Sequence, residues 1–187
     1  MAEQAIPLRK RPLDLILFSF FLINLLFITY GVDLESLVVP DAYHFTYPLW
    51  PPRIAVDVIH FYGRTLDPDL MARPPWWKMT IWIEVIFFGP FYLAALYAFL
   101  KGRDWIRIPS IMYATSIITN VLIILSEEKY GDYPAPNFPV VLLINLPWVI
   151  FPGLLLVRMA RDPHPFTAPQ RSGNVIPIPT QQPTPLE

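Results

Sequence analysis

One stretch of the sequence, MTIWIEVIFFGPFYLAALYAFL at residues 79–100, limits the possible folds more than any other. Its 22 residues include a single charged side chain, Glu84. At about 1.5 Å of rise per residue, a helix of this length crosses the hydrocarbon of a lipid bilayer. The sequence therefore predicts a transmembrane helix over residues 79–100.

Glu84 is the unusual residue of this predicted helix. A carboxylate inside a membrane helix costs about 2.5–3.5 kcal/mol at the centre of the bilayer and less towards an edge. We therefore expect Glu84 to be protonated, paired with another group, or facing a cavity. The alternative is a surface role, in which its side chain reaches back to the membrane interface.

The composition indicates a small polytopic membrane protein. The 187 residues are 54% hydrophobic and only 16% charged, and the net charge of −1 does not favour nucleic-acid binding. The absence of cysteine excludes disulfides, thiol catalysis and thiolate metal sites. The three histidines have no spacing typical of a metal site. We predict no metal, no cofactor and no catalytic residue.

Three further apolar segments complete the predicted fold, at residues 13–32, 105–125 and 140–157. The fold class is thus all-α, a bundle of four transmembrane helices. Between the first two spans, residues 54–64 are expected to form a short helix whose apolar face carries Ile54, Val58 and Phe61.

The chain divides into three predicted regions. Residues 1–12 form a basic N-terminus, residues 13–159 form the membrane domain, and the proline-rich tail, residues 160–187, is expected to be disordered. Lysine and arginine gather at both termini and in the 101–107 turn, so the positive-inside rule places these in the cytosol. The two larger loops then face the lumen.

With this topology, polar side chains from all four spans fall at one end of the membrane. They are Asp33, Glu84, the Ser116, Thr119 and Asn120 face, and Asn145 with Trp148. Polar groups in lipid seek one another or a cavity, so we expect one polar site roofed by residues 34–78. The alternatives are that the polar side chains only join helices, and that Trp76, Trp77 and Trp82 only anchor the membrane interface.

The chemistry of such a site favours a lipophilic cation or a sterol. Two carboxyl groups in one apolar pocket do not both ionise cheaply, so one is expected to hold a proton. Aromatic side chains such as Phe61, Phe88 and Trp148 are available for cation–π or apolar contact. A sterol, whose single hydroxyl needs one or two polar partners, also suits the site.

Several motifs resemble the EXPERA-domain family, which includes sterol isomerases and the sigma-2 receptor type. The likeness is greatest to the sigma-2 type, in the same order along roughly residues 10–160. The motifs are Leu66-Asp67-Pro68, Pro74-Pro75-Trp76-Trp77-Lys78, Tyr97-Ala98-Phe99-Leu100-Lys101-Gly102 and Trp105-Ile106-Arg107-Ile108-Pro109.

The resemblance implies a four-helix protein of the endoplasmic reticulum membrane that binds sterols or cationic amphiphiles and regulates lipid traffic or protein handling. Its partners would be that ligand, membrane lipid and, in a homodimer, a second copy. Asp33 resembles the carboxylate that pairs with an amine, Glu84 its protonated partner, and Asp67 the loop acid that supports the site. Asn145 and Trp148 fall where the sigma-2 type has two pocket tyrosines.

Residues of the fourth span also resemble the isomerases of this family, in Asn145-Leu146-Pro147-Trp148 and Phe151-Pro152-Gly153. Those enzymes use a histidine and a glutamate four residues apart on the first span. This chain offers Asn24 and Ile28 there, and neither donates and recovers a proton at neutral pH. A binding protein is therefore favoured. Sterol isomerisation by relocated acids remains an alternative, as does a membrane adaptor, for example in mitochondrial precursor handling.

Overall fold

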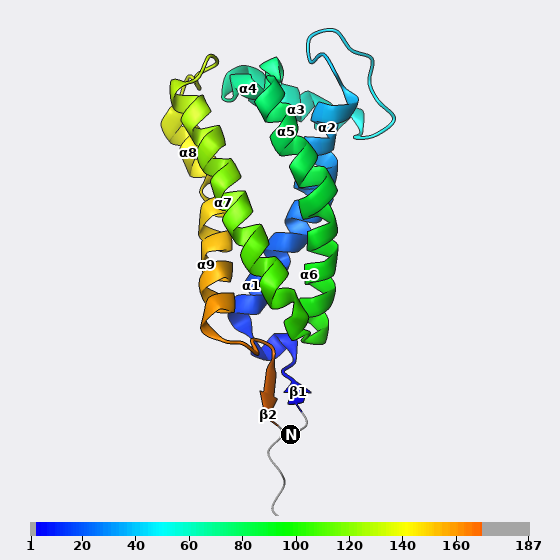
Figure 1. Ribbon diagram of the computed structural model, residues 1–187. Helices are drawn as coiled ribbons and strands as arrows, with labels where there is room; N and C mark the ends of the chain where they lie inside the picture. The colour runs from blue at the N-terminus through cyan, green and yellow to red at the C-terminus, as the bar shows by residue number, and fades with distance from the viewer. Residues whose placement is uncertain (1–2, 170–187) are drawn as a thin grey trace, which may run out of the picture.

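Four long helices form the molecule, whose computed structural model describes residues 3–169. The helices within these residues that are long and apolar enough to span a membrane are Pro12–Val38, Pro75–Lys101, Asp104–Tyr130 and Phe138–Arg161. They form an up-and-down bundle, with short helices across one end and both ends of the described chain at the other (Figure 1). We call these the roof end and the terminal end. The predicted all-α membrane bundle is confirmed.

The first span is continuous through α1 (Pro12–Ile23), the π-helical segment η2 (Asn24–Asp33) and α2 (Leu34–Val38). The sequence predicted an end near residue 32, where the apolar run stops. The helix instead ends at Val38. The next residue, Val39, is extended because a residue before proline, here Pro40, disfavours helical dihedrals. Asp33 therefore lies within the helix and not at its end.

The second span comprises α5 (Pro75–Ile83), the π-helical segment η3 (Glu84–Phe88) and α6 (Gly89–Lys101). It begins four residues before the predicted start, because Pro75 fits the first turn of a helix, where its missing N–H is not needed. It ends at Gly102, whose φ of 62° is the left-handed conformation typical of a helix end. Trp77 consequently points into the bundle and is buried, contrary to the interfacial role considered for it.

The third and fourth spans are also longer than predicted. The third is the short 3₁₀ turn η4 (Asp104–Ile106) followed by α7 (Arg107–Tyr130), and the fourth is α8 (Phe138–Asn145) followed by α9 (Pro147–Arg161). Hydropathy marks the apolar run and not the end of the helix, so α7 continues past residue 125. As a result Glu128 lies in a helix and is fully buried.

Two short helices cover the roof end, α3 (Arg53–Thr65) and α4 (Pro68–Ala72) (Figure 1). The helix predicted at residues 54–64 is present, but its buried residues lie off the predicted apolar face, of whose three residues Val58 alone lines the cavity described below. Ile54, Val58 and Phe61 are 63–74% exposed. The buried residues are Val56, Ile59, His60 and Gly63. Both faces of α3 carry apolar residues, so periodicity alone could not choose between them.

At the terminal end, the strands β1 (Glu3–Ala5) and β2 (Thr167–Pro169) pair antiparallel. Phe166, just before β2, is fully buried, with its ring centroid 4.8 Å from that of Phe99. The sequence predicted a disordered tail over residues 160–187. The structure instead continues α9 to Arg161 and forms β2, because Phe166 supplies an apolar anchor. Residues 170–187 lie outside the described part of the chain.

The terminal end also contains a buried ion network. Asp14 is 1% exposed and pairs with Arg11 at 2.8 Å and with Arg158 at 3.2 Å. These contacts join the start of the first span to the end of the fourth.

Candidate ligand-binding site

A cavity of about 360 Å³ lies below the roof, between the spans. Its wall is mostly apolar, with polar side chains at a few points. The polar and aromatic side chains of the wall include Asp33, Asp67, Trp77, Glu84, Asn120, Asn145 and Trp148. They come from all four spans and from the connection between α3 and α4, so the fold brings together residues up to 115 positions apart in the sequence.

Asp33 and Glu84 form the acidic part of the cavity wall. The Thr29 hydroxyl donates a hydrogen bond to Glu84 Oε1 at 2.8 Å, which ties the first span to the second. The carboxyl groups of Asp33 and Glu84 interact with each other. Within residues 3–169 no basic side chain pairs with either acid. Both residues lie in π-helical segments, a helix distortion that is frequent at functional sites.

Gly89 allows the first and second spans to approach at this point. A Cβ atom at position 89 would lie 2.7 Å from the Tyr30 hydroxyl oxygen and 3.2 Å from Thr29 Cγ2. Any larger side chain would therefore require the Tyr30 side chain or the first span to shift. The close approach is what places the Thr29 hydroxyl within hydrogen-bond distance of Glu84.

Two buried tyrosines lie below the acids. The Tyr92 and Tyr113 hydroxyl oxygens are 3.1 Å apart, and Tyr92 also interacts with Glu84. Their rings belong to an aromatic core in which the centroid of Phe91 stacks 4.4 Å from that of Tyr113. This rigid floor holds the acidic wall in place, since close-packed aromatic rings leave little freedom to adjacent side chains.

Asp67 is the third acid of the cavity and lies in the roof. Its Oδ1 accepts a hydrogen bond from the Leu70 N–H at 3.1 Å, so it caps the N-terminus of α4. Its carboxyl group also interacts with that of Glu128 from α7. Burial raises the pKa of Asp67 above its ordinary value, and burial together with the charges of Asp67 and Glu128 raises the pKa of Tyr62.

Glu128 was not predicted as a site residue. The apolar run of the third span ends at Leu125, which placed Glu128 in a loop. The available signal was the good helical sequence Ser126-Glu127-Glu128-Lys129, which extends the span by one turn and brings Glu128 beneath the roof.

The amide and indole groups of the wall are partly engaged within the bundle. The Trp148 indole N–H donates to Asn24 Oδ1 at 2.7 Å, so Asn24 serves to fix this ring. The Asn145 amide donates to the Val141 carbonyl at 2.9 Å. In contrast, the buried Trp77 indole N–H has no hydrogen-bond acceptor within residues 3–169, although Trp77 lines the cavity.

Six of the nine residues proposed from the sequence line this cavity, namely Asp33, Asp67, Glu84, Asn120, Asn145 and Trp148. The other three lie elsewhere. Phe61 is 69% exposed on the outer face of α3. Phe88 packs in the aromatic core, 5.1 Å from the Tyr113 ring. The Thr119 hydroxyl donates to the Thr115 carbonyl, and Thr119 lines a separate groove between the second and third spans.

Within the described part of the chain, no group of three or more His, Cys, Asp or Glu side chains is placed to hold a metal ion.

Comparison with known proteins agrees with this architecture. Residues 54–159 match the family model described as EXPERA (EXPanded EBP superfamily). The chain is 32% identical to sigma intracellular receptor 2 of Xenopus tropicalis over 158 residues, which cover 79% of this chain and 88% of the relative. It is 28% identical to sigma intracellular receptor 2 of Homo sapiens over 172 residues, which cover 84% and 93%. The chain belongs to the EXPERA family and is a membrane protein similar to the sigma-2 receptors.

Proposed function

We propose that the cavity binds a lipophilic amine or a sterol within the membrane. The observation that carries this proposal is the Asp33–Glu84 pair, which lines a largely apolar cavity in the membrane-spanning bundle and has no basic partner within residues 3–169. A buried carboxylate without a counter-charge is destabilising, so its presence favours a positively charged ligand.

The two acids suit an ammonium group if they share one proton. The ionised carboxylate then pairs with the amine, and the protonated carboxyl donates a hydrogen bond to its ionised neighbour. Trp77 and Trp148 line the same cavity and offer aromatic faces for the cation or for the apolar body of the ligand.

A sterol is the neutral ligand that the same wall accommodates. The Trp77 indole N–H is a donor without an acceptor in the described part of the chain, and a sterol hydroxyl supplies one. The ring system would then lie against the apolar wall, where burial of aliphatic surface favours binding by about 25 cal/mol per Å².

The cellular setting that we propose is the one that the family resemblance of the sequence implies. It is the endoplasmic reticulum membrane, with both termini in the cytosol and the roof end towards the lumen. Ligand occupancy would there regulate sterol or lipid traffic or protein handling. Support comes from the relatives' name, sigma intracellular receptor 2, and from the clustering of lysine and arginine at the terminal end.

Saturation binding of a labelled lipophilic guanidine to purified protein tests this function. Asp33→Asn is expected to weaken binding by about 30-fold or more, because a buried ionic partner is worth about 2–5 kcal/mol. Asp57→Asn is the matched control, since Asp57 is an exposed acid on the roof helix outside the cavity lining. Its affinity should equal that of the wild type.

The outcome that contradicts the proposal is equally clear. If folded wild-type protein binds neither the guanidine nor a labelled sterol, the cavity is not a ligand site. The chain would then be examined as a membrane adaptor by identifying its protein partners.

A further inference from the structure

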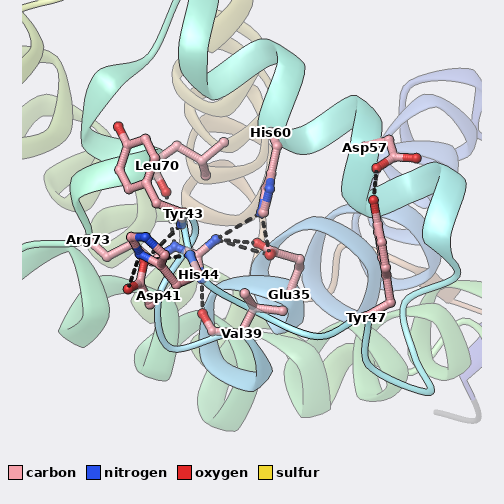
Figure 2. Close-up of polar contacts among 10 residues, drawn as sticks. All are labelled: Glu35, Val39, Asp41, Tyr43, His44, Tyr47, Asp57, His60, Leu70 and Arg73. Atoms are coloured by element: carbon pink, nitrogen blue, oxygen red, sulfur yellow. Dashed lines mark hydrogen bonds and ion pairs between the residues drawn. The ribbon is translucent and has the colours of Figure 1, made fainter.

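Three ionisable side chains lie against one another at the roof end (Figure 2). Glu35 comes from α2, His60 from α3, and Arg73 from the connection between α4 and α5. Their exposed fractions are 0%, 3% and 4%. We call this set the roof clasp. It is distinct from the cavity because none of the three residues lines it.

The roof clasp is fully paired. Arg73 Nη2 donates to Glu35 Oε2 at 2.7 Å and to Oε1 at 3.0 Å, and His60 Nε2 lies 2.8 Å from Glu35 Oε1. Arg73 also donates from Nε to the Leu70 carbonyl at 3.1 Å and from Nη1 to the Val39 carbonyl. The guanidinium therefore contacts both ends of the segment that forms the roof.

The backbone of Arg73 adopts an unusual conformation in this arrangement. Its φ of 51° lies in the left-handed region, which a residue with a long side chain rarely adopts. This conformation ends α4 and aims the side chain inward. Strain of this kind persists only where surrounding contacts hold it, and the pairing with Glu35 supplies those contacts.

Each member of the roof clasp is close in sequence to a residue that lines the cavity. Glu35 is two residues after Asp33, His60 directly follows Ile59, and Arg73 is three residues after Leu70. Three segments of the cavity wall are therefore joined to one another through a single buried carboxylate. If the clasp opens, these segments are free to separate.

Electrostatics explain why such a network specifies position more than it adds stability. Taking charges out of water costs about as much as their pairing returns, so apolar side chains of similar volume would usually hold α3 as firmly. A buried, paired set of ions instead requires one geometry, because any displacement leaves a charge buried and unpaired. The roof clasp thus defines a closed position for α3.

We infer that Glu35, His60 and Arg73 are positioning residues that keep the roof closed and separate the cavity from the aqueous side. In doing so they control how water-soluble molecules reach the cavity. The inference rests on the proposed function only for its consequence, that the bound ligand is shielded from the aqueous side. Closure itself is measured without any ligand.

The absence of cysteine from the chain makes closure directly measurable. Val121, a buried residue of the cavity wall on α7, is replaced by cysteine of similar size. The protein is reconstituted in lipid vesicles and treated with a charged, membrane-impermeant thiol reagent from the roof side. The rate of labelling reports how often the roof opens.

Two substitutions break the roof clasp and two preserve it. His60→Leu and Arg73→Gln should raise the labelling rate by about tenfold or more. His60→Gln, which keeps an N–H donor towards Glu35, and Arg73→Lys, which keeps the charge, should lie within about threefold of the intact clasp. Thermal unfolding in detergent identifies any variant that is not folded.

Two results would overturn the inference. One is an unchanged labelling rate in folded His60→Leu and Arg73→Gln. The other is equal acceleration by His60→Leu and His60→Gln, which would show that the donor to Glu35 is irrelevant. Failure of the proposed function would appear differently. The guanidine would then fail to protect the thiol introduced at position 121 from the reagent, even with the clasp intact.

Discussion

Asp33 and Glu35 are two residues apart on one helix, yet their carboxyl groups lie in opposite surroundings. Glu35 is fully buried and is paired with a guanidinium and an imidazole. Asp33 lines a cavity, and the ionisable group that interacts with it is another acid, Glu84. Positions i and i+2 of a helix point to different sides, so neighbouring acids meet different environments.

The difference separates charges that hold the fold from charges that remain available to a ligand. A paired buried ion is satisfied by the protein and is costly to disturb. An unpaired acid in a largely apolar cavity destabilises the protein by itself, and it persists where another molecule supplies the missing counter-charge. The roof clasp and the cavity thus illustrate the two uses of a buried carboxylate at one end of the same bundle.

The largest effect on stability is expected from a substitution that removes the central carboxylate of the roof clasp. Glu35→Ala leaves His60 and Arg73 buried without their carboxylate and should lower the free energy of unfolding by about 3–5 kcal/mol. Asp33→Asn removes an acid without a basic partner and should leave that free energy unchanged or raise it. Chemical denaturation in detergent micelles measures both. Equal destabilisation by the two substitutions would remove the distinction between the two acids.

The second largest effect on stability is expected where the first two spans approach each other beside the acidic wall of the cavity. Gly89→Ala places a Cβ 2.7 Å from the Tyr30 hydroxyl and should cost about 1–3 kcal/mol of stability and weaken ligand binding. Gly153→Ala is the matched control in α9, because a Cβ there meets nothing within 4 Å. It should be neutral or stabilising by up to about 1 kcal/mol. Similar affinities in the two variants would show that this approach does not shape the site.

Asp69, in the roof helix α4, is another acid that no basic side chain pairs with in the described part of the chain. Burial, together with the charges of Asp67, Glu127 and Asp132, raises its pKa to about 6, and its Oδ2 has no hydrogen-bond partner within residues 3–169. The folded state therefore holds a proton that the unfolded state releases at lower pH. The stability from this proton is complete below about pH 4 and is lost as the pH rises through 6.

Asp69→Asn should consequently raise stability by about 2 kcal/mol at about pH 7.5 and have little effect below about pH 4. Thermal unfolding of both proteins across this range of pH checks the prediction. A difference that is independent of pH would mean that Asp69 acts through packing or capping and not through its charge.

The smallest expected effect concerns the Trp148 indole, whose N–H is already hydrogen-bonded within the bundle. Trp148→Phe removes the N–H that donates to Asn24 at 2.7 Å and should cost about 1 kcal/mol. Ligand affinity should change little, because an aromatic face remains on the cavity wall. A large loss of affinity with unchanged stability would instead assign the indole N–H to the ligand.

Much of the fold could be predicted because long apolar runs have few alternatives in a membrane. The prediction that Asp33, Glu84 and Asn145 converge followed from the alternation of span directions, and the cavity contains all three. The helix ends were placed too early, since turns bearing Glu35 or Glu128 continue a helix after the apolar run has stopped.

The roof clasp could not be derived from the sequence. Its members are separated by 25 and 13 residues in a long connection, and nothing in their spacing indicates a pair. His60 lies on the buried face of α3. Because its side chain is polar, a hydrophobicity pattern does not identify that face as the buried one. The left-handed turn at Arg73 brings its guanidinium to the Glu35 carboxylate, which His60 also contacts.

The most direct test of the account compares two ligands on two proteins. A lipophilic amine and its neutral isostere, with carbon in place of the basic nitrogen, are bound to the wild type and to Asp33→Asn. We expect the wild type to prefer the amine by about 30-fold or more and Asp33→Asn to reduce this preference below about threefold. An undiminished preference for the amine in folded Asp33→Asn would contradict the assignment of Asp33 as the partner of the ligand's charge.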